Sequence, residues 1–375
     1  MFGLVFLGFW IAFHGYLAWH LLRMRAMAGS RKARLRTLSL VGLLALLFPV
    51  SRAIEADGLT AATYVLALVG TTWAGTLLLA VPCLLAVDVA TLFGRAWRLH
   101  VERLRAGAFV LAGALSLVAL VQGFRPPVVV EHEVVLPSLP RSADGTTLVL
   151  VSDLHLGATL DEDWLADRVE QIEALQADAV LLAGDVVEGR RIPLDVLAGM
   201  EPILRRLEPR LGTFAVAGNH DWHGTFDFEK FVAAAGIELL KDEWVELVPG
   251  LVLAGVGDHG GHSFDYRGAG RAERALRNRP KGAATLFLSH RPVDGGPLAQ
   301  AGVALSLAGH THGGQLWPYG FLAWLRNPYY CGRYDEEGLT TIVTRGLGTW
   351  GPRMRLWAPS EIVFITLRSG DASTN

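Results

Sequence analysis

The chain has 375 residues, of which 51% are hydrophobic, and its formal net charge is −2 at pH 7. This length exceeds one average domain, and a mean hydropathy of +0.33 is high for a soluble protein, so we expect part of the chain to lie in lipid. The balanced charge argues against nucleic-acid binding, and only two cysteines, far apart in the sequence, argue against a disulfide framework and a Cys-rich zinc site.

Four apolar stretches precede residue 124. The first begins without a basic residue and is followed by six of them, which is typical of an uncleaved membrane anchor rather than a signal peptide. The second is short and contains Pro49, but Arg52 could extend its side chain to the interface and lengthen the span. We predict transmembrane helices at residues 2–22, 38–54, 61–87 and 107–123.

The charges of the connecting segments orient these helices. Segment 23–37 contains six basic and no acidic residues, and segment 88–106 contains four basic and two acidic residues. Both are therefore expected on the cytoplasmic side, which places everything after residue 124 outside the cytosol. If the second stretch were only re-entrant, the orientation would be reversed.

Residues 125–368 are predicted to form one α/β domain, preceded by the membrane region 1–124 and followed by a loose tail, 369–375. Residues 125–127 mark a stiff exit from the membrane, and the alternating stretch 128–136 is typical of an edge strand. Strand and helix patterns then alternate, which indicates βαβ units and a largely parallel inner sheet. Strands are expected at residues 146–151, 179–183, 213–217, 244–247, 251–256, 285–288, 303–308, 340–344 and 361–367, and helices at 161–175, 194–207, 228–235 and 271–277.

Five of these strands end in clusters of residues that bind metals. Each cluster alone has an ordinary explanation as a helix cap or a turn. Together they are more informative, because ligands of α/β proteins gather at the carboxyl ends of the strands, where Asp, Asn and His would build one polynuclear metal site. The clusters are Ser152-Asp153-Leu154-His155, Gly184-Asp185, Gly218-Asn219-His220-Asp221, Ser289-His290 and Gly309-His310-Thr311-His312.

These residue types suit phosphoester hydrolysis. Two divalent ions about 4 Å apart can activate water and hold the oxygens of a phosphoryl group. Asp185 suits a bridging carboxylate, and two anionic ligands leave the centre cationic, so that it attracts a phosphate ester. His220, beside Asn219, suits a general acid, while Asp221 either orients it or caps the turn.

The order of the five clusters resembles the calcineurin-like metallophosphoesterase superfamily over residues 128–368. The sequences around Asp153, His310 and Arg345 are similar to the bacterial membrane-anchored branch that includes the YkuE and YaeI phosphodiesterases. The resemblance implies an α/β sandwich of two sheets flanked by helices. It also implies a protein of the bacterial cytoplasmic membrane, whose catalytic domain the charges of the connecting segments place outside.

The resemblance also implies roles for individual residues. His220 would protonate the leaving group. Glu188 departs from the Asp that relatives often have at this position and is not among the implied ligands. One ion would be bound by Asp153, His155, Asp185 and His312, and the other by Asp185, Asn219, His290 and His310.

We therefore expect a hydrolase with two ions of Mn, Fe or Zn that acts on a membrane-associated or envelope phosphoester. The expected partners are the bilayer and a substrate that could be lipid-linked, with no nucleic acid or protein partner. One alternative is a pyrophosphatase of a UDP-diacylglucosamine-type lipid, which the predicted orientation disfavours because that substrate is cytosolic. The other is a non-catalytic, membrane-anchored metal-binding scaffold, which would be expected to have lost ligands.

An aromatic run, residues 317–325, directly follows the last cluster. It either packs within the domain or forms an apolar lip that meets the bilayer or an acyl chain. His223, His259 and His262 are the remaining histidines placed to approach the site, and we expect them at the surface.

Overall fold

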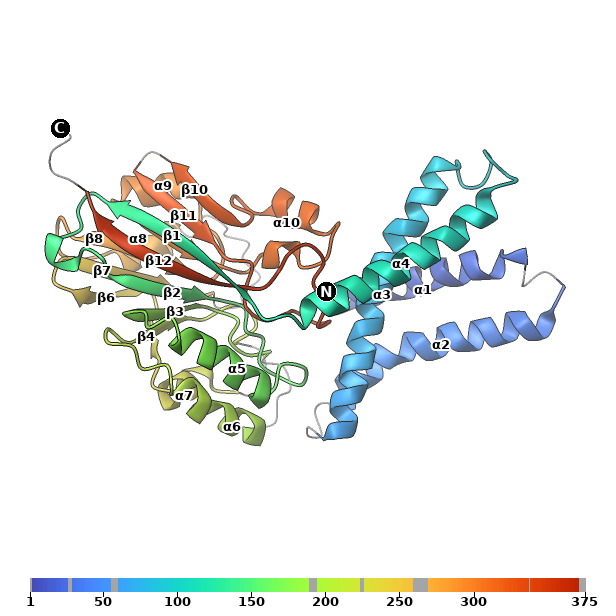
Figure 1. Cartoon of the computed structure of the whole chain (residues 1–375), viewed down its shortest axis with the longest axis horizontal. Helices are drawn as coiled ribbons and strands as arrows, with labels where there is room; N and C mark the ends of the chain where they lie inside the picture. Colours follow the sequence, from blue (N-terminus) through green and yellow to red (C-terminus); the bar gives the residue numbers. More distant parts are fainter. Residues whose placement is uncertain are drawn as a thin grey trace. The chain divides into compact units, whose positions relative to one another are not determined.

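The computed structural model describes residues 2–25, 29–54, 60–188, 194–222, 226–258, 269–336 and 338–370, so His223, His259 and His262 lie outside the described residues. The chain forms two compact units (Figure 1). The helical unit contains Met1–Arg125, Leu316–Pro318 and Gly351–Trp357. The sandwich unit contains Pro126–Gln315, Tyr319–Trp350 and Ala358–Asn375.

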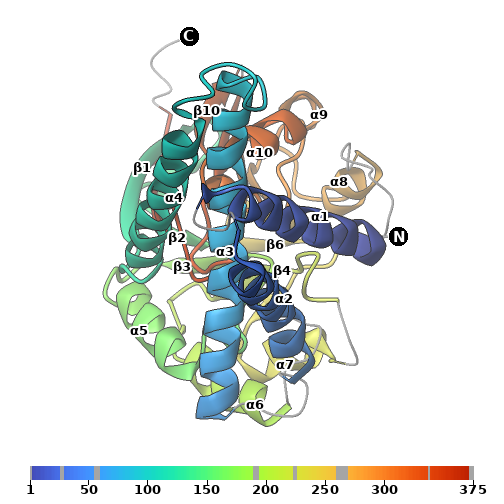
Figure 2. The ribbon, with the colours of Figure 1, turned by 90° about the vertical axis from the view of Figure 1, so that its right-hand side faces the viewer.

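Four long helices dominate the helical unit: α1 (Phe2–Leu22), α2 (Arg31–Ile54), α3 (Ala61–Ala90) and α4 (Val101–Gly123). Each is long and apolar enough to span a membrane, as predicted. The central helix, α3, packs against the other three (Figure 2). Its buried positions include Ala67, Gly70 and Ala74, whose small side chains let neighbouring helices approach closely.

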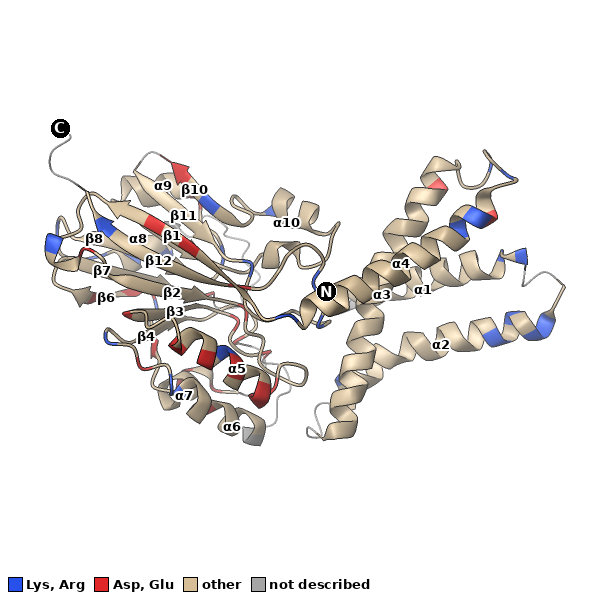
Figure 3. Ribbon diagram, viewed as in Figure 1, with Lys and Arg blue, Asp and Glu red and all other residues tan. Residues whose placement is uncertain are grey.

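Two of these helices begin earlier than predicted. α2 starts at Arg31 and α4 at Val101, so their first turns include basic residues that we had assigned to the connecting segments. Long basic side chains can reach the interface while their backbone stays helical, which explains the difference. Basic residues gather at one end of the helices (Figure 3), where Arg25 after α1 forms a 2.9 Å ion pair with Glu102 of α4.

The sandwich unit contains two six-stranded mixed sheets, which confirms the predicted fold class. In the first sheet β12 is antiparallel to β2, and the other neighbours are parallel. In the second sheet the four central strands are parallel, and β10 and β6 are antiparallel edge strands. The first sheet has the order β1 (Val128–Leu136), β12 (Glu361–Ser369), β2 (Thr147–Val151), β3 (Ala179–Ala183), β4 (Thr213–Val216), β5 (Glu238–Leu239). The second has the order β10 (Gly332–Glu336), β11 (Leu339–Val343), β9 (Leu305–Ala308), β8 (Ala284–Ser289), β7 (Leu251–Val256), β6 (Glu243–Val248).

Apolar residues on both faces of the strands build the layers of the sandwich. In β2, Leu148 and Leu150 belong to the core between the sheets, whereas Val149 and Val151 pack toward helices. Helices α5 (Glu162–Glu173), α6 (Leu194–Leu204) and α7 (Phe228–Ala234) contribute to the core on the outer face of the first sheet. Helices α8 (Ala269–Ala275) and α9 (Gly295–Gln300) do so on the second sheet. Strands buried on both faces are near-continuous apolar runs, which is why the sequence revealed them.

Short elements complete the sandwich unit. They include two 3₁₀ turns, η3 (Arg141–Ala143) and η4 (His312–Gly314), and the seven-residue helix α10 (Gly320–Arg326). These elements were not predicted, because η3 and η4 have only three residues each and α10 is apolar almost throughout, so none of them shows an amphipathic period. Of them, η4 begins at His312, the last residue of the Gly309–His312 cluster, and α10 is the next helix along the chain.

Candidate metal centre

The seven predicted ligands lie at the carboxyl ends of strands from both sheets, where the sequence placed them. Within the sandwich unit, β2, β3 and β4 of the first sheet and β8 and β9 of the second deliver them. The structure brings six of them into two groups whose ligand atoms lie within 4.8 Å of one another. The seventh, Asn219, is in contact with the second group.

The first group consists of Asp153, His155 and His312. The Nε2 atoms of His155 and His312 lie 3.2 Å apart. Nε2 of His312 lies 3.3 Å from Oδ1 of Asp153, and Nε2 of His155 lies 4.0 Å from the same oxygen. One carboxylate and two imidazoles therefore face a common point.

The second group consists of Asp185, His290 and His310, with Asn219 beside it. Nε2 of His290 lies 3.2 Å from Oδ2 of Asp185 and 3.2 Å from Oδ1 of Asn219. Nδ1 of His310 lies 3.0 Å from Nε2 of His290. The amide oxygen of Asn219 thus joins a carboxylate and two imidazoles.

Asp185 connects the two groups. Its Oδ2 lies 3.2 Å from Nε2 of His290 in the second group and 3.8 Å from Nε2 of His155 in the first. Its Oδ1 accepts a hydrogen bond of 2.8 Å from the backbone N–H of His220. This position is the one that a carboxylate bridging two ions requires.

The donor set fits two divalent cations. Ligand atoms about 2.1 Å from a shared ion lie roughly 3.0 to 3.4 Å from one another, close to most of the separations above. Nδ1–H of His290 donates to the carbonyl of Ala183, and Nδ1–H of His155 donates to Glu188, so each Nε2 is left to face the centre. Oδ1 of the fully buried Asp153 makes no hydrogen bond to any described residue, as expected of an oxygen reserved for a cation.

The backbone of the ligands is strained. Left-handed φ angles between 46° and 69° occur at five of the seven ligands, at a cost of about 1–3 kcal/mol each for such residues. The strand ends hold this conformation through the hydrogen bonds from Asp153 N–H to Gly184 O and from His155 N–H to Asp185 O, both 2.9 Å. Strain of this kind persists where it serves a function. The five ligands are Asp153, His155, Asp185, His310 and His312.

Two glycines are needed because other groups approach them closely. A Cβ atom on Gly218 would lie 2.2 Å from Oδ1 of Asp185, and one on Gly309 would lie 2.0 Å from Oγ of Ser152. Both glycines directly precede a predicted ligand. The Gly-Asn-His-Asp and Gly-His-x-His patterns are therefore also steric requirements of the centre.

Negative charge dominates the electrostatics of the centre. Burial opposes the charged form of His290, but Asp185 and Asp153 outweigh it and raise its pKa to about 10. Burial also opposes the charged form of His155, but the hydrogen bond and charge of Glu188 raise its pKa to about 9. Nearby carboxylate charge thus raises the pKa of both imidazoles, and bound divalent cations would balance that charge.

His220 and Asp221 lie beside the two groups. Nδ1 of His220 lies 3.2 Å from Oε2 of Glu188, and its ring stands edge-on to the His155 ring, with 4.9 Å between centroids. The carboxylate of Asp221 accepts backbone hydrogen bonds from Asp185, Val187 and Gly218, at 2.7 to 3.0 Å. These bonds favour a turn-capping role for Asp221 over the alternative of orienting His220. They also hold the loop that carries Asp185 in place.

Glu188 was not among the predicted site residues. Its Oε2 accepts a 2.8 Å hydrogen bond from Nδ1–H of His155 and lies within reach of His220 as well. Burial opposes its ionisation, but these two histidines outweigh it and hold the pKa of Glu188 well below its usual range. Its position in the Gly-Asp-x-x pattern, where relatives often have Asp, was the signal that could have revealed it.

Arg291 places a cation beside the second group. Its Nη2 donates to Oδ1 of Asn219 at 3.3 Å, and its Nε forms an ion pair with Asp258. Asp258 thus positions a charged group next to a predicted ligand. Arg291 remains partly exposed, so it can also contact a bound anion.

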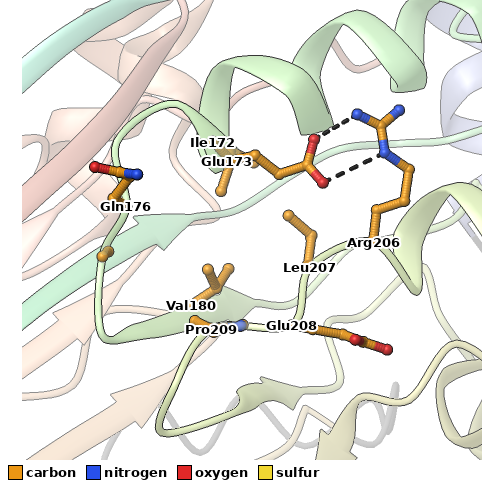
Figure 4. A pocket seen from close by; sticks show the side chains of 9 residues that line it. Ile172, Glu173, Gln176, Val180, Arg206, Leu207, Glu208 and Pro209 are labelled. Atoms are coloured by element: carbon orange, nitrogen blue, oxygen red, sulfur yellow. Dashed lines mark hydrogen bonds and ion pairs between the residues drawn. The ribbon is translucent and has the colours of Figure 1, made fainter.

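A pocket elsewhere in the sandwich unit carries no such chemistry. The described residues that line it include none of the predicted ligands, and one wall is the surface ion pair between Arg206 and Glu173 (Figure 4). It is lined by Ile172, Glu173, Gln176, Ala177, Val180, Arg206, Leu207, Glu208 and Pro209.

The sequence of this chain is similar to those of known metallophosphoesterases. The family model of calcineurin-like phosphoesterases matches residues 146–314. A Danio rerio transmembrane protein with a metallophosphoesterase domain is 34% identical over 274 residues, which cover 70% of this chain and 62% of the relative, so the chain covers less than two thirds of that protein's length. An uncharacterised Aquifex aeolicus metallophosphoesterase is 35% identical over 238 residues, covering 61% of this chain and 87% of the relative.

The Bacillus subtilis metallophosphoesterase YkuE is 27% identical over 255 residues, which cover 64% of this chain and 85% of YkuE. The similarity to this group that the five clusters indicated is thereby confirmed. The chain is a membrane protein and belongs to the calcineurin-like metallophosphoesterase family.

Proposed function

We propose that the protein hydrolyses a phosphoester of a membrane-associated or envelope substrate at a centre of two divalent ions. The observation that carries the proposal is the convergence of two Asp/His groups on Asp185. All seven predicted ligands are present and in contact, which a non-catalytic scaffold would not need. The mixed nitrogen and oxygen donors suit Mn, Fe or Zn.

The geometry supports the following ligand sets. Asp153, His155 and His312 would hold one ion and His290, His310 and Asn219 the other, with Asp185 shared between them. When bound, two such ions supply Lewis acidity to the phosphoryl oxygens and lower the pKa of a coordinated water. The protein's part is to hold seven donors in fixed, largely buried positions.

We assign the protonation of the leaving group to His220. Its Nδ1 lies 3.2 Å from Oε2 of Glu188, and this contact fixes the orientation of the ring. Nε2 is then the atom that transfers the proton. Arg291, beside Asn219, would bind a phosphate oxygen and orient the ester for this transfer.

We also propose that the protein lies in a bacterial cytoplasmic membrane with the sandwich unit outside the cytosol. The basic residues at the α1–α2 and α3–α4 connections support this orientation. A UDP-diacylglucosamine-type substrate would lie on the cytosolic side of the membrane, away from the sandwich unit.

The activity is tested with the full-length protein in detergent, Mn²⁺ and bis-p-nitrophenyl phosphate. We expect Asp185→Asn and His220→Ala each to lower kcat by at least about 100-fold, because one removes the shared ligand and the other the general acid. Asp227→Asn, at the exposed cap of α7, is the control and should change kcat less than twofold. Full activity of Asp185→Asn would refute the proposal.

A further inference from the structure

Helix α10 presents large apolar side chains to solvent. Phe321, Leu322, Trp324 and Leu325 are between 52% and 69% exposed, and every residue of the helix is exposed or half-buried. Apolar groups packed this densely on seven consecutive residues form a patch rather than scattered surface residues. Such a patch requires an apolar partner.

The charge around α10 is compatible with a membrane surface. Residues 309–334 contain no Asp or Glu, and Arg326 ends α10 exposed, whereas Arg333 forms a 2.9 Å ion pair with Asp335. An aromatic helix that ends in an exposed Arg matches the headgroup region of a membrane that contains anionic lipids.

The chain reaches α10 directly from the helical unit. Within that unit, the exposed rings of Trp317 and Trp357 lie 5.4 Å apart, centroid to centroid. The backbone N–H of Trp357 donates to Oε1 of Gln122 at 2.9 Å, which places the two rings beside the last turn of α4. Tryptophans at the end of a spanning helix mark the membrane interface. Only Tyr319 separates Pro318 of this unit from the start of α10.

Within the sandwich unit, α10 is fixed to the loop that carries His312. The Cα of Gly320 lies so close to Gly314 that a Cβ atom on Gly314 would be 2.2 Å from it. The hydroxyl of Tyr330, just after α10, donates to the carbonyl of Gly313. A membrane contact at α10 would therefore also position a metal ligand.

Trp350, an exposed aromatic residue outside α10, lies next to His220, the proposed general acid. The side chain of Gln315 binds both the N–H and the carbonyl of Trp350, at 2.9 and 3.1 Å. The exposed Trp350 ring stands edge-on to the His220 ring, with 6.1 Å between centroids. An apolar group attached to a substrate would thus meet an aromatic surface near His220.

We propose that α10 lies in the headgroup region of the bilayer that holds α1–α4, with Phe321, Trp324 and Leu325 among the acyl chains. The metal centre then hydrolyses the phosphoester of a lipid while the lipid remains in the membrane. The occupant of the patch is the bilayer itself. This inference rests on the proposed phosphoesterase activity for its substrate class, but the docking of α10 can be measured without any turnover.

Docking is tested on the full-length protein in nanodiscs that contain phosphatidylglycerol and nitroxide-labelled phosphatidylcholine. Cys83 and Cys331, the two cysteines, are replaced by Ser, and an NBD fluorophore is attached through Leu325→Cys or, as the control, through Val135→Cys on the exposed side of β1. We expect at least twofold quenching at position 325 and less than 1.2-fold quenching at position 135. Phe321→Cys repeats the test if Leu325→Cys does not fold. Equal quenching at both positions would overturn the proposal and leave a protein partner or a second copy as the occupant.

The substrate class is tested with two esters that share the reacting bond, hexadecyl and methyl p-nitrophenyl phosphate. We expect Trp324→Ser/Leu325→Ser to lower kcat/KM for the hexadecyl ester at least 10-fold and for the methyl ester less than twofold, and Val135→Ser to change neither. An equal loss for both esters would show a structural role and refute the lipid inference. Absence of turnover of either ester by the unchanged protein would refute the phosphoesterase proposal, while the quenching result would still decide whether α10 docks.

Discussion

At the scale of single residues, one carboxylate serves both a predicted metal ligand and the predicted general acid. Glu188 lies 2.8 Å from Nδ1 of His155 and 3.2 Å from Nδ1 of His220. Side chains that hydrogen-bond to metal ligands and so orient them commonly contribute 10- to 100-fold to metal affinity or activity. Residue types alone indicated the ligands, but the link through Glu188 depends on how two loops meet.

We predict that Glu188→Gln lowers kcat about 10- to 100-fold, because the amide no longer holds the rings of His155 and His220 as the carboxylate does. Steady-state kinetics with bis-p-nitrophenyl phosphate would measure the effect. Glu188→Asp, with the shorter residue that relatives often have, should restore part of the rate. An unchanged kcat in Glu188→Gln would show that Glu188 positions neither histidine.

The left-handed backbone of five ligands could not be predicted from the sequence. Asp, Asn and His tolerate this conformation better than most residues, so their presence is compatible with it but does not require it. The conformation arises from hydrogen bonds between loops, such as that from His155 N–H to Asp185 O. Sequence patterns can indicate residue types and strand ends, but not these long-range contacts.

At the scale of elements, the predicted strands agree well with the structure because strands buried on both faces are apolar throughout. The stretch 179–183 coincides with β3, which is buried along its whole length. The stretch 128–136 coincides with β1, an edge strand that is largely exposed and that its alternating pattern revealed instead. The helices α9 and α10 were not predicted, since the first begins with Gly-Gly-Pro and the second is apolar almost throughout, so neither shows an amphipathic period. The role of α10 depends on whether its side chains are exposed. The sequence did not decide between packing within the domain and an apolar lip at the surface.

The spanning helices contain a buried polar cluster around Asp88, which we had placed in a connecting segment but which belongs to α3. Its carboxylate accepts a 2.7 Å hydrogen bond from the hydroxyl of Tyr16 and lies 3.1 Å from Nε2 of His20. Nη2 of Arg105 in α4 lies 3.4 Å from the other oxygen. The cluster therefore joins α1, α3 and α4.

We predict that Asp88→Ala destabilises the protein by about 3–5 kcal/mol, because Arg105 is left buried without its counter-charge. Glu102→Ala is the matched control: it removes an exposed ion pair with Arg25 and should cost less than about 1 kcal/mol. Thermal unfolding in detergent would compare them. Equal stabilities of the two variants would show that the cluster does not hold the helices together.

At the scale of the whole molecule, the chain returns twice from the sandwich unit to the helical unit, through Leu316–Pro318 and Gly351–Trp357. In the helical unit, Met354 packs against Gly75 of α3, where a Cβ would lie 2.6 Å from its sulfur. The N–H of Arg355 donates to the carbonyl of Ala119 in α4 at 2.9 Å. Composition predicted a single boundary near residue 124; these two returns could not be predicted, because segments of seven residues or fewer scarcely alter local hydropathy.

The orientation in the membrane is tested by fusing alkaline phosphatase or green fluorescent protein after residue 368. Because four spans with cytoplasmic basic connections place the sandwich unit outside, we expect the phosphatase fusion to be active and the fluorescent fusion dark. Fusions after residue 30, between α1 and α2, should behave in the opposite way. A dark fusion at residue 30 together with a fluorescent one at 368 would reverse the proposed topology.

The central claim, that seven side chains hold two ions around Asp185, is tested most directly by metal analysis of the purified full-length protein. The arrangement predicts about two transition-metal ions per chain, and a loss of at least one of them in Asp185→Asn while the protein remains folded. A content that stays below one ion per chain after incubation with Mn²⁺, Fe²⁺ and Zn²⁺, or that is unchanged in Asp185→Asn, would contradict it.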